Sequence, residues 1–235
     1  MRLPFLDADH PVFPPPERAL REPNGLLGAG GNLRVATLLD AYRRGIFPWF
    51  EAGQPPLWWS PDPRTVLYPD QVHVSRTMAR LLPRGGYAIT TDQAFAAVIR
   101  GCAAPRAGAT GTWIVPEMIA AYRALHAAGH AHSVECWVDG ELAGGIYGVA
   151  VGRVFCGESM FSARSNASKL ALIHLARGLS AAGFALIDCQ VGNPHLATLG
   201  ATPLPRAAFL ERLREGLRHP PPAWPATLIS AMVAG

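Results

Sequence analysis

The chain has 235 residues, enough for one compact domain or two small ones. With 49% apolar and only 16% charged residues it can bury a core, which excludes an intrinsically disordered chain. With 21 Lys and Arg against 17 Asp and Glu, the formal net charge is +4, a mild basic bias that excludes a polycationic tail. Lys169 is the only lysine.

The sequence shows no sign of export, of membrane insertion or of a metal site. The N-terminus lacks the apolar run of a signal peptide, and no segment approaches the roughly 18 apolar residues that span a bilayer. The four cysteines lack the Cys-x-x-Cys spacing of zinc and redox motifs. We therefore expect a soluble cytoplasmic protein with reduced thiols and no bound metal.

Residues 1–62 predict a small N-terminal domain that is rich in proline. A helix is expected after Asn32 and should end at Gly45. The glycine-rich segment 25–31 has no preceding strand, so we expect a tight turn at the start of this helix and not a dinucleotide-binding motif. The aromatic segments 47–50 and 57–61 are interrupted by prolines and predict ordered loops.

Residues 63–235 predict a second domain. Helices are expected after Ser75, from Asp92 to about Cys102, and from Pro116 to Gly129. The period of the pattern then changes to two, and the segments 134–138, 142–150 and 154–156 predict an antiparallel meander. A helix over 167–182 and a nearly all-apolar strand over 184–190, typical of parallel pairing, follow. This is the core order of the acetyltransferase-like (GNAT) fold, so we predict an α+β fold.

Polar side chains follow two neighbouring strands of this predicted sheet. Glu158 comes after the meander, and Asp188 and Gln190 end the apolar strand. Open sheets place ligands at strand ends, and an acid at the end of an apolar strand must find a partner or face a cleft. Loop and helix capping would account for Ser162 and Asn166, but not for the other three residues together. We therefore expect a site here.

Two further patterns have both a functional and an ordinary interpretation. Trp49 and Trp113 lie in loops and Arg76, Arg80 and Arg84 recur every fourth residue, as in a surface that stacks bases and follows phosphates. The alternative is buried tryptophans and a solvated helix face. Three histidines have spacing like that of metal ligands, but no acid or thiol lies beside them in the sequence, so we expect a polar helix end; they are His126, His130 and His132.

Six blocks, spread in order over residues about 4 to 210, resemble the leucyl/phenylalanyl-tRNA–protein transferase family. They are Gly45–Trp49, Trp58–Pro61, Gly111–Trp113, Gly157–Ser162, Asn166–Lys169, and Asp188–Gln190 with Asn193–Leu196. The resemblance implies a GNAT-like catalytic domain that uses no coenzyme A and no other cofactor. It implies transfer of Leu or Phe, and less well Met, from charged tRNA to the N-terminal Arg or Lys of a protein, which marks that protein for degradation.

The resemblance also implies roles for single residues. Gln190, polarised by Asp188, would receive a proton through its carbonyl oxygen, and Glu158 would help to hold the incoming amine. Trp49 and Trp113 would engage the terminal adenosine of the tRNA with help from Tyr122, and the arginine strip Arg76, Arg80 and Arg84 would contact the acceptor stem. The remaining substrate-binding residues would form the pocket for Leu or Phe and its surroundings: Ile146, Phe155, Gly157, Ser159, Leu172, Ile187 and Asn193.

Other functions remain open at this level. A coenzyme A-dependent N-acyltransferase would have the same fold order, but no Gln/Arg-x-x-Gly-x-Gly/Ala loop for a pyrophosphate follows Cys156. A noncatalytic RNA-binding module is the third possibility. We expect a monomer whose partners are aminoacyl-tRNA and an acceptor protein, without a membrane.

Overall fold

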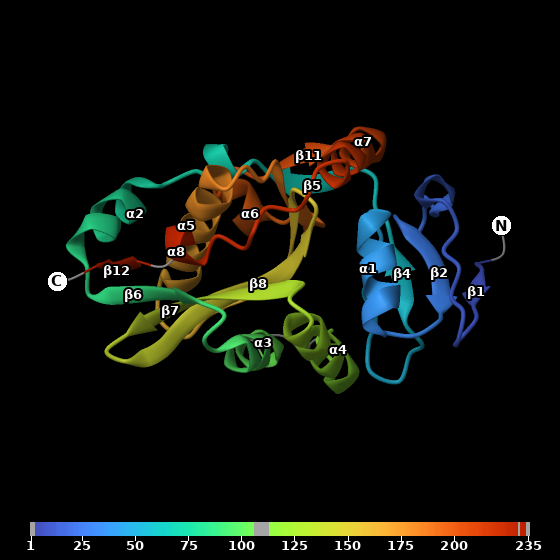
Figure 1. The fold of residues 1–235 in the computed structure, drawn as a ribbon, viewed down its shortest axis with the longest axis horizontal. Coiled ribbons are helices and arrows are strands. Elements are labelled where there is room, and N and C mark those ends of the chain that lie inside the picture. Colours follow the sequence, from blue (N-terminus) through green and yellow to red (C-terminus); the bar gives the residue numbers. More distant parts are fainter. Residues whose placement is uncertain (1–2, 106–112, 230, 234–235) are drawn as a thin grey trace.

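Two β-sheets organise the chain, and helices cover both faces of the larger one (Figure 1). The computed structural model describes residues 3–105, 113–229 and 231–233. The predicted α+β class, with a small N-terminal part, is confirmed. No helix in the described residues is long and apolar enough to cross a membrane.

The small sheet lies near the N-terminus and has the strand order β1-β2-β4-β3. Its elements are β1 (Phe5–Leu6), β2 (Leu26–Gly30), β3 (Phe47–Pro48) and β4 (Leu57–Trp59), with the 3-10 turn η1 (Pro16–Arg18) and helix α1 (Val35–Arg43). Asn32 does not cap α1, because the N-cap position is Arg34; its side chain instead accepts the backbone N–H of Arg34 in the turn before the helix. Gly45, at φ +74°, follows the helix end.

Two further predictions for this region were wrong. The glycine-rich segment forms strand β2 and not a turn. Its glycines lack side chains that would keep the neighbouring strands β1 and β4 at a distance. At Gly30, with φ +83°, a Cβ would lie 2.7 Å from the ring of Phe5. The aromatic segments also contain strands, and Pro48 is tolerated because β3 is an edge strand.

The large sheet has the strand order β11-β5-β10-β9-β8-β7-β6-β12, and only β9 and β10 pair in parallel. The strands are β5 (Arg64–Leu67), β6 (Tyr87–Thr91), β7 (Ala131–Val138), β8 (Glu141–Val151), β9 (Val154–Ser162), β10 (Leu186–Gln190), β11 (Thr202–Leu204) and β12 (Ala231–Val233). The predicted meander is thus β7, β8 and β9. The predicted parallel strand is β10.

Helices lie on both faces of this sheet, with α3 and α4 on one side and α5 on the other (Figure 1). The helices and 3-10 turns are η2 (Pro69–Gln71), α2 (Arg76–Leu81), η3 (Leu82–Arg84), α3 (Phe95–Ala103), α4 (Pro116–Ala127), α5 (Ala167–Ala181), α6 (Pro194–Thr198), α7 (Arg206–Leu217) and α8 (Ala226–Ile229). Ser75 caps α2 through the N–H of Met78, as predicted. Asp92 does not cap α3, which begins at Phe95, because its carboxylate faces β7 instead.

The expected domain boundary after residue 62 falls between β4 and β5. One apolar cluster continues across this point and includes Leu38 and Trp58 on one side with Val66 and Tyr147 on the other. Helix α1 contacts α4, α7 and β8 of the larger part. The boundary at residue 62 therefore stays a prediction, while the shared core holds the two parts together.

Candidate active site

A cavity of about 1140 Å³ opens where β10 ends and along the second half of β9. This volume exceeds the range of about 300–1,000 Å³ that is common for small-molecule sites, so the cavity can hold a larger ligand. It brings together residues from β3, α3, β8, β9, α5, β10 and α6. The predicted site residues that line it are Trp49, Trp113, Ile146, Gly157, Glu158, Ser159, Leu172, Ile187, Gln190 and Asn193. Because β9 continues to Ser162, Glu158 lies within this strand, whereas the sequence predicts it after the strand.

Three of the predicted catalytic and substrate-binding residues do not line the cavity. Tyr122 is fully buried in α4, so it has no surface for the adenosine contact that the resemblance implied. Phe155 is buried in the core, where its ring lies 5.7 Å from that of Trp224. Asp188 is fully buried beneath the cavity. Gly111 and Thr112, which precede Trp113 in the third block, lie outside the described residues.

Glu158 is the one carboxylate among the described residues that line the cavity. Its Oε1 accepts hydrogen bonds from the Tyr42 hydroxyl at 2.7 Å and from Gln190 Nε2 at 2.8 Å. Its Oε2 accepts one from the Tyr122 hydroxyl at 2.7 Å. The carboxylate is therefore held from three sides, by α1, α4 and β10, while it keeps a face on the cavity.

Burial raises the pKa of Glu158 from 4.5 to about 7, although the two tyrosine hydroxyls oppose this by stabilising the ionised form. The nearby charge of Asp188 raises the pKa further. A carboxyl group of this kind can both accept and release a proton near neutral pH. The site thus contains a group suited to acid–base chemistry.

Asp188 is neutralised by Arg64, a residue that the sequence did not point out. The guanidinium donates from Nε to Oδ1 and from Nη2 to Oδ2, each at 2.7 Å, and both side chains are 1% exposed. The rings of Phe47 and Phe209 lie on the guanidinium at 4.7 Å each. A bidentate pair of this geometry leaves Asp188 committed to a structural partner.

The structure corrects the expected contact between Asp188 and Gln190. Asp188 Oδ1 accepts the backbone N–H of Gln190 at 2.9 Å and does not touch its side-chain amide, which donates to Glu158. Gln190 has φ +62°, a left-handed conformation that non-glycine residues seldom adopt. Arg64 and Asp188 thus fix the backbone that aims Gln190 at Glu158.

Aromatic side chains lie at the mouth of the cavity. Trp49 is 41% exposed, and its ring lies 5.5 Å from that of Trp59 at an angle of 53°. Trp59 Nε1 donates to the backbone oxygen of Trp49 at 2.6 Å, which fixes the loop after β3. Trp113 lines the same cavity. An exposed and braced indole of this kind can stack on a nucleobase.

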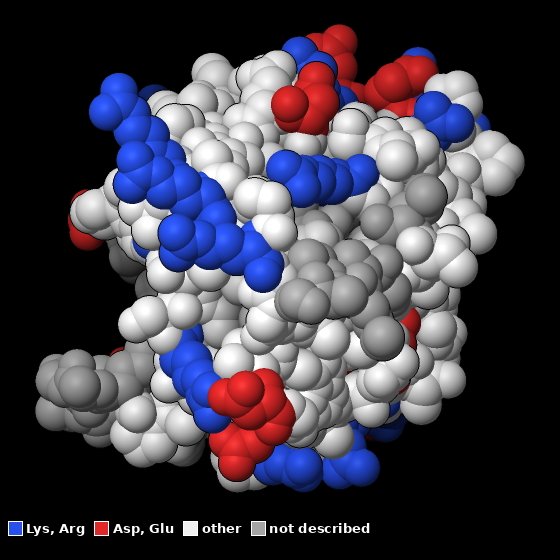
Figure 2. Space-filling view, turned by 90° about the vertical axis from the view of Figure 1, so that its left-hand side faces the viewer, with Lys and Arg blue, Asp and Glu red and all other residues white. Residues whose placement is uncertain are grey.

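The three arginines predicted to contact tRNA are exposed on α2 and η3; they are Arg76, Arg80 and Arg84. Figure 2 shows the end of the molecule that carries α2, and Lys and Arg side chains gather there in a band across the upper left. Acidic side chains are grouped mainly elsewhere on this face. The surface is thus suited to an anionic ligand.

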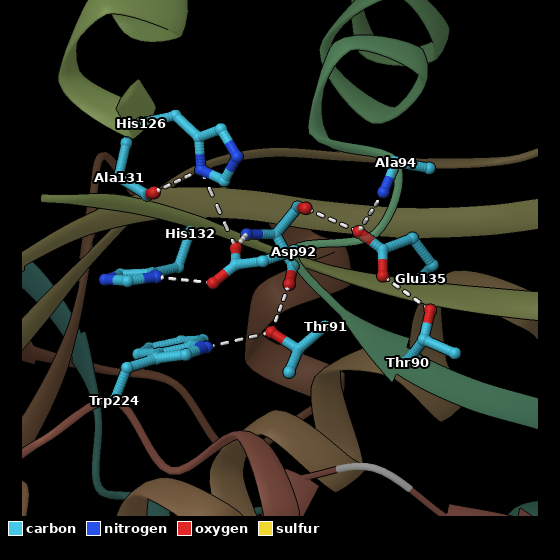
Figure 3. Close-up of polar contacts among 10 residues, drawn as sticks. Thr90, Thr91, Asp92, Ala94, His126, Ala131, His132, Glu135 and Trp224 are labelled. Carbon is cyan, nitrogen blue, oxygen red and sulfur yellow. Dashed lines mark hydrogen bonds and ion pairs between the residues drawn. The ribbon is translucent and has the colours of Figure 1, made fainter. Parts of the chain in front are cut away.

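The predicted polar helix end at the histidines has an acidic partner that the sequence did not reveal. Figure 3 shows His126 and His132 turned toward Asp92. Asp92 Oδ2 lies 2.8 Å from His132 Nδ1, and Oδ1 accepts the backbone N–H of Ser133. Among the described residues, no three His, Cys, Asp or Glu side chains could together hold a metal ion.

The same cluster fastens the C-terminal segment to the sheet. The ring of Trp224 stacks on that of His132 with centroids 4.0 Å apart, and its Nε1 donates to Thr91 Oγ1 (Figure 3). Beside it, the buried Glu135 accepts a hydrogen bond from Thr90. All these groups have protein partners, so we assign the cluster a structural role.

Comparisons with known proteins show the family of this chain. A family model described as "Leucyl/phenylalanyl-tRNA protein transferase" matches residues 66–214, and one for its N-terminal domain matches residues 31–62. A relative from Chromobacterium violaceum with the same family name is 57% identical over 220 residues, 94% of each chain. One from Pseudomonas fluorescens is 56% identical over 218 residues, 93% of this chain and 96% of the relative.

These matches define the class of the protein, which is an enzyme of the aminoacyltransferase type. They favour it over the coenzyme A-dependent alternative and over a noncatalytic module. The chain belongs to the leucyl/phenylalanyl-tRNA–protein transferase family.

Two solved structures give weak likenesses, each with a TM-score of 0.38. A GCN5-related N-acetyltransferase from Kribbella flavida is 13% identical, and the match covers 69% of this chain and 58% of that one. The L-PGS structure from Bacillus licheniformis is 10% identical, with coverage of 71% and 53%.

Proposed function

We propose that this chain transfers Leu or Phe, and less well Met, from charged tRNA to the N-terminal Arg or Lys of a protein. The family gives the general reaction, which is transfer of an aminoacyl group from tRNA to protein. The observation that supports the rest is the cavity itself. It combines an apolar pocket, the exposed indole of Trp49 with the half-buried indole of Trp113, and one carboxylate where an ester and an amine could meet.

The apolar part of the cavity suits a Leu or Phe side chain. Ile146, Leu172 and Ile187 line it and are at most 6% exposed, so they are already packed before a ligand enters. A preformed apolar pocket selects by size and shape, at about 1–3 kcal/mol per methylene. Leu and Phe fill such a pocket, whereas charged side chains would lose their hydration there.

The tRNA end would meet the indoles and the basic surface. Trp49 and Trp113 would stack on the terminal adenosine, and the arginines of α2 and η3 would contact backbone phosphates. Phosphate contacts position a nucleic acid without reading its sequence, which suits an enzyme that accepts several tRNAs.

The reaction is aminolysis of an ester by an α-amine. Gln190 would orient the amine, since its nitrogen is occupied by Glu158 and its carbonyl oxygen is the atom that remains to accept a hydrogen bond. Glu158 and Asp188 are the two acids of the site, and Asp188 is paired with Arg64. Glu158 is therefore the acid that would meet the acceptor. The product, a protein that begins with Leu or Phe, would be marked for degradation.

A transfer assay tests this function. Radiolabelled Leu-tRNA should pass its label to a protein that begins with Arg, and treatment with RNase beforehand should abolish the transfer. The matched control is the same acceptor with an N-terminal Glu, which should receive no label. Equal transfer from leucyl-coenzyme A, or transfer that survives RNase, would contradict the proposal.

A further inference from the structure

Glu158 and two tyrosines form a closed ring of oxygen contacts. Tyr42 comes from α1, Tyr122 from α4 and Glu158 from β9, and all three side chains are buried. Each hydroxyl contacts one carboxylate oxygen at 2.7 Å, and the two hydroxyl oxygens lie 2.5 Å from each other. Three oxygen groups therefore make three mutual contacts of hydrogen-bond length.

A count of protons shows how this ring can be satisfied. Each tyrosine hydroxyl has one proton to donate, and an ionised carboxylate has none. With Glu158 ionised, two protons serve three contacts, and one pair of oxygens must meet without a proton between them. With Glu158 protonated, the ring has three protons, so that each oxygen group donates once. In the ionised state both hydroxyl protons therefore go to the carboxylate, and a third proton, taken up by Glu158, would supply the contact between the two hydroxyls.

Asp188, Cys156 and Tyr147 also lie near Glu158, but none of them is free to accept a proton near neutral pH. Asp188 on β10 is paired with Arg64 on β5. Burial raises the pKa of the Cys156 thiol on β9 and of the Tyr147 hydroxyl on β8, so both remain protonated near neutral pH. Gln190 Nε2 steadies Oε1 in either protonation state of the ring.

We infer that Glu158 is the proton shuttle of the aminoacyl transfer, and that Tyr42 and Tyr122 are positioning residues whose hydroxyls hold its carboxylate in place until it accepts the proton. The inference rests on the proposed function. It differs from a scheme in which the neutral amide of Gln190 receives the proton, because an amide is a far weaker base than a carboxylate.

The step balances within the site. The neutral α-amine of the acceptor attacks the ester carbonyl, and as the C–N bond forms, one N–H proton passes to Glu158 and completes the ring. The bond between the carbonyl carbon and the 3′-oxygen of the tRNA then breaks, and Glu158 returns the proton to that oxygen. The products are an amide and a free 3′-hydroxyl, and Glu158 ends ionised as it began.

Steady-state kinetics with Leu-tRNA test the shuttle. Glu158→Gln keeps the size of the side chain but cannot exchange a proton, so kcat should fall about 100-fold or more while the KM for Leu-tRNA stays within about twofold. Tyr42→Phe and Tyr122→Phe each remove a hydroxyl that stabilises the ionised carboxylate, so the pKa of Glu158 should rise and the acid limb of kcat/KM should move to higher pH. Tyr147→Phe is the matched control, because this equally buried hydroxyl has no hydrogen-bond partner among the described residues. Its pH profile should not move.

Several results would overturn the inference. Glu158→Gln with near wild-type kcat would do so, as would an acid limb that moves with His195→Gln and not with Tyr42→Phe, since His195 also lines the cavity. If Glu158→Gln fails to fold, the single-turnover rate of the wild-type protein decides, since a rate unchanged from about one pH unit below 7 to one above would exclude the shuttle. A wild-type protein that transfers no label would instead refute the proposed function.

Discussion

Arg64 and Asp188 face each other across β5 and β10, joined by two hydrogen bonds of 2.7 Å and both buried. Removal of one partner of such a pair leaves an uncompensated charge in the interior. Arg64→Met should therefore lower the free energy of unfolding by about 3–5 kcal/mol in urea denaturation. Arg64→Lys, which keeps the charge but not the two parallel bonds, should cost less.

The control is an exposed ion pair. Arg34 lies 3.1 Å from Asp9, and both side chains are mostly exposed. Arg34→Met should change the free energy of unfolding by less than about 1 kcal/mol. If Arg34→Met and Arg64→Met lowered the free energy of unfolding equally, burial of the Arg64–Asp188 pair would not be the reason for its large contribution.

Glu158 makes stability fall as pH rises. Its pKa is about 7 in the folded protein against 4.5 as the ordinary value, so between these pH values the folded state retains a proton that the unfolded state has lost. The stability from the protonated group is fully present below pH 4.5 and is lost as pH rises to about 7. The free energy of unfolding of the wild type, relative to Glu158→Gln, should drop by roughly 3 kcal/mol over this window. A free energy of unfolding that increases over this window would show instead that the folded protein favours the ionised carboxyl group.

Salt dependence tests the basic surface. If Arg76, Arg80 and Arg84 each neutralise one phosphate, their combined replacement by Gln should reduce the slope of log K against log salt by about 2–3. Arg18→Gln with Arg21→Gln is the control, because these residues belong to the N-terminal region, at the opposite end of the molecule from α2 (Figure 1). A slope that changes equally in both variants would place the tRNA elsewhere.

The size of the apolar pocket should set the choice between Leu and Phe. Leu172→Ala enlarges the pocket, so Leu loses contacts while the longer Phe side chain can still reach the far wall. The ratio of kcat/KM for Phe-tRNA to that for Leu-tRNA should rise about tenfold or more in a competition assay. Val191→Ala, at an exposed lining position, should leave the ratio within about twofold. An unchanged ratio in Leu172→Ala would remove this residue from the pocket.

The sequence was informative wherever a local pattern decides the structure. The strand period of the meander and the apolar strand β10 were sufficient to predict the four central strands of the large sheet. The polar residues that come after these apolar runs were sufficient to place Glu158 and Gln190 in one site, although Glu158 lies within β9. The small sheet was missed because its strands are short, and its glycines and prolines resemble those of loops.

Partners that are distant in the sequence could not be predicted in this way. Tyr42 is separated from Glu158 by 116 residues, and Arg64 from Asp188 by 124. Both pairs form because the fold packs distant segments against each other, and such contacts produce no periodic pattern in the sequence. A signal did exist for Arg64, since it begins an apolar strand and the buried Asp188 required a cation.

Tyr42 reaches Glu158 from α1, the helix that leads through Gly45 to β3 and Trp49. One short stretch of chain thus supplies a proton donor at the base of the cavity and an indole at its mouth. If Trp49 moves when it stacks on a nucleotide, α1 can move with it and change the hydrogen bond from Tyr42 to Glu158. Binding of the tRNA end and readiness for chemistry are then mechanically linked, so an empty enzyme and a loaded one need not hold the same proton with the same strength.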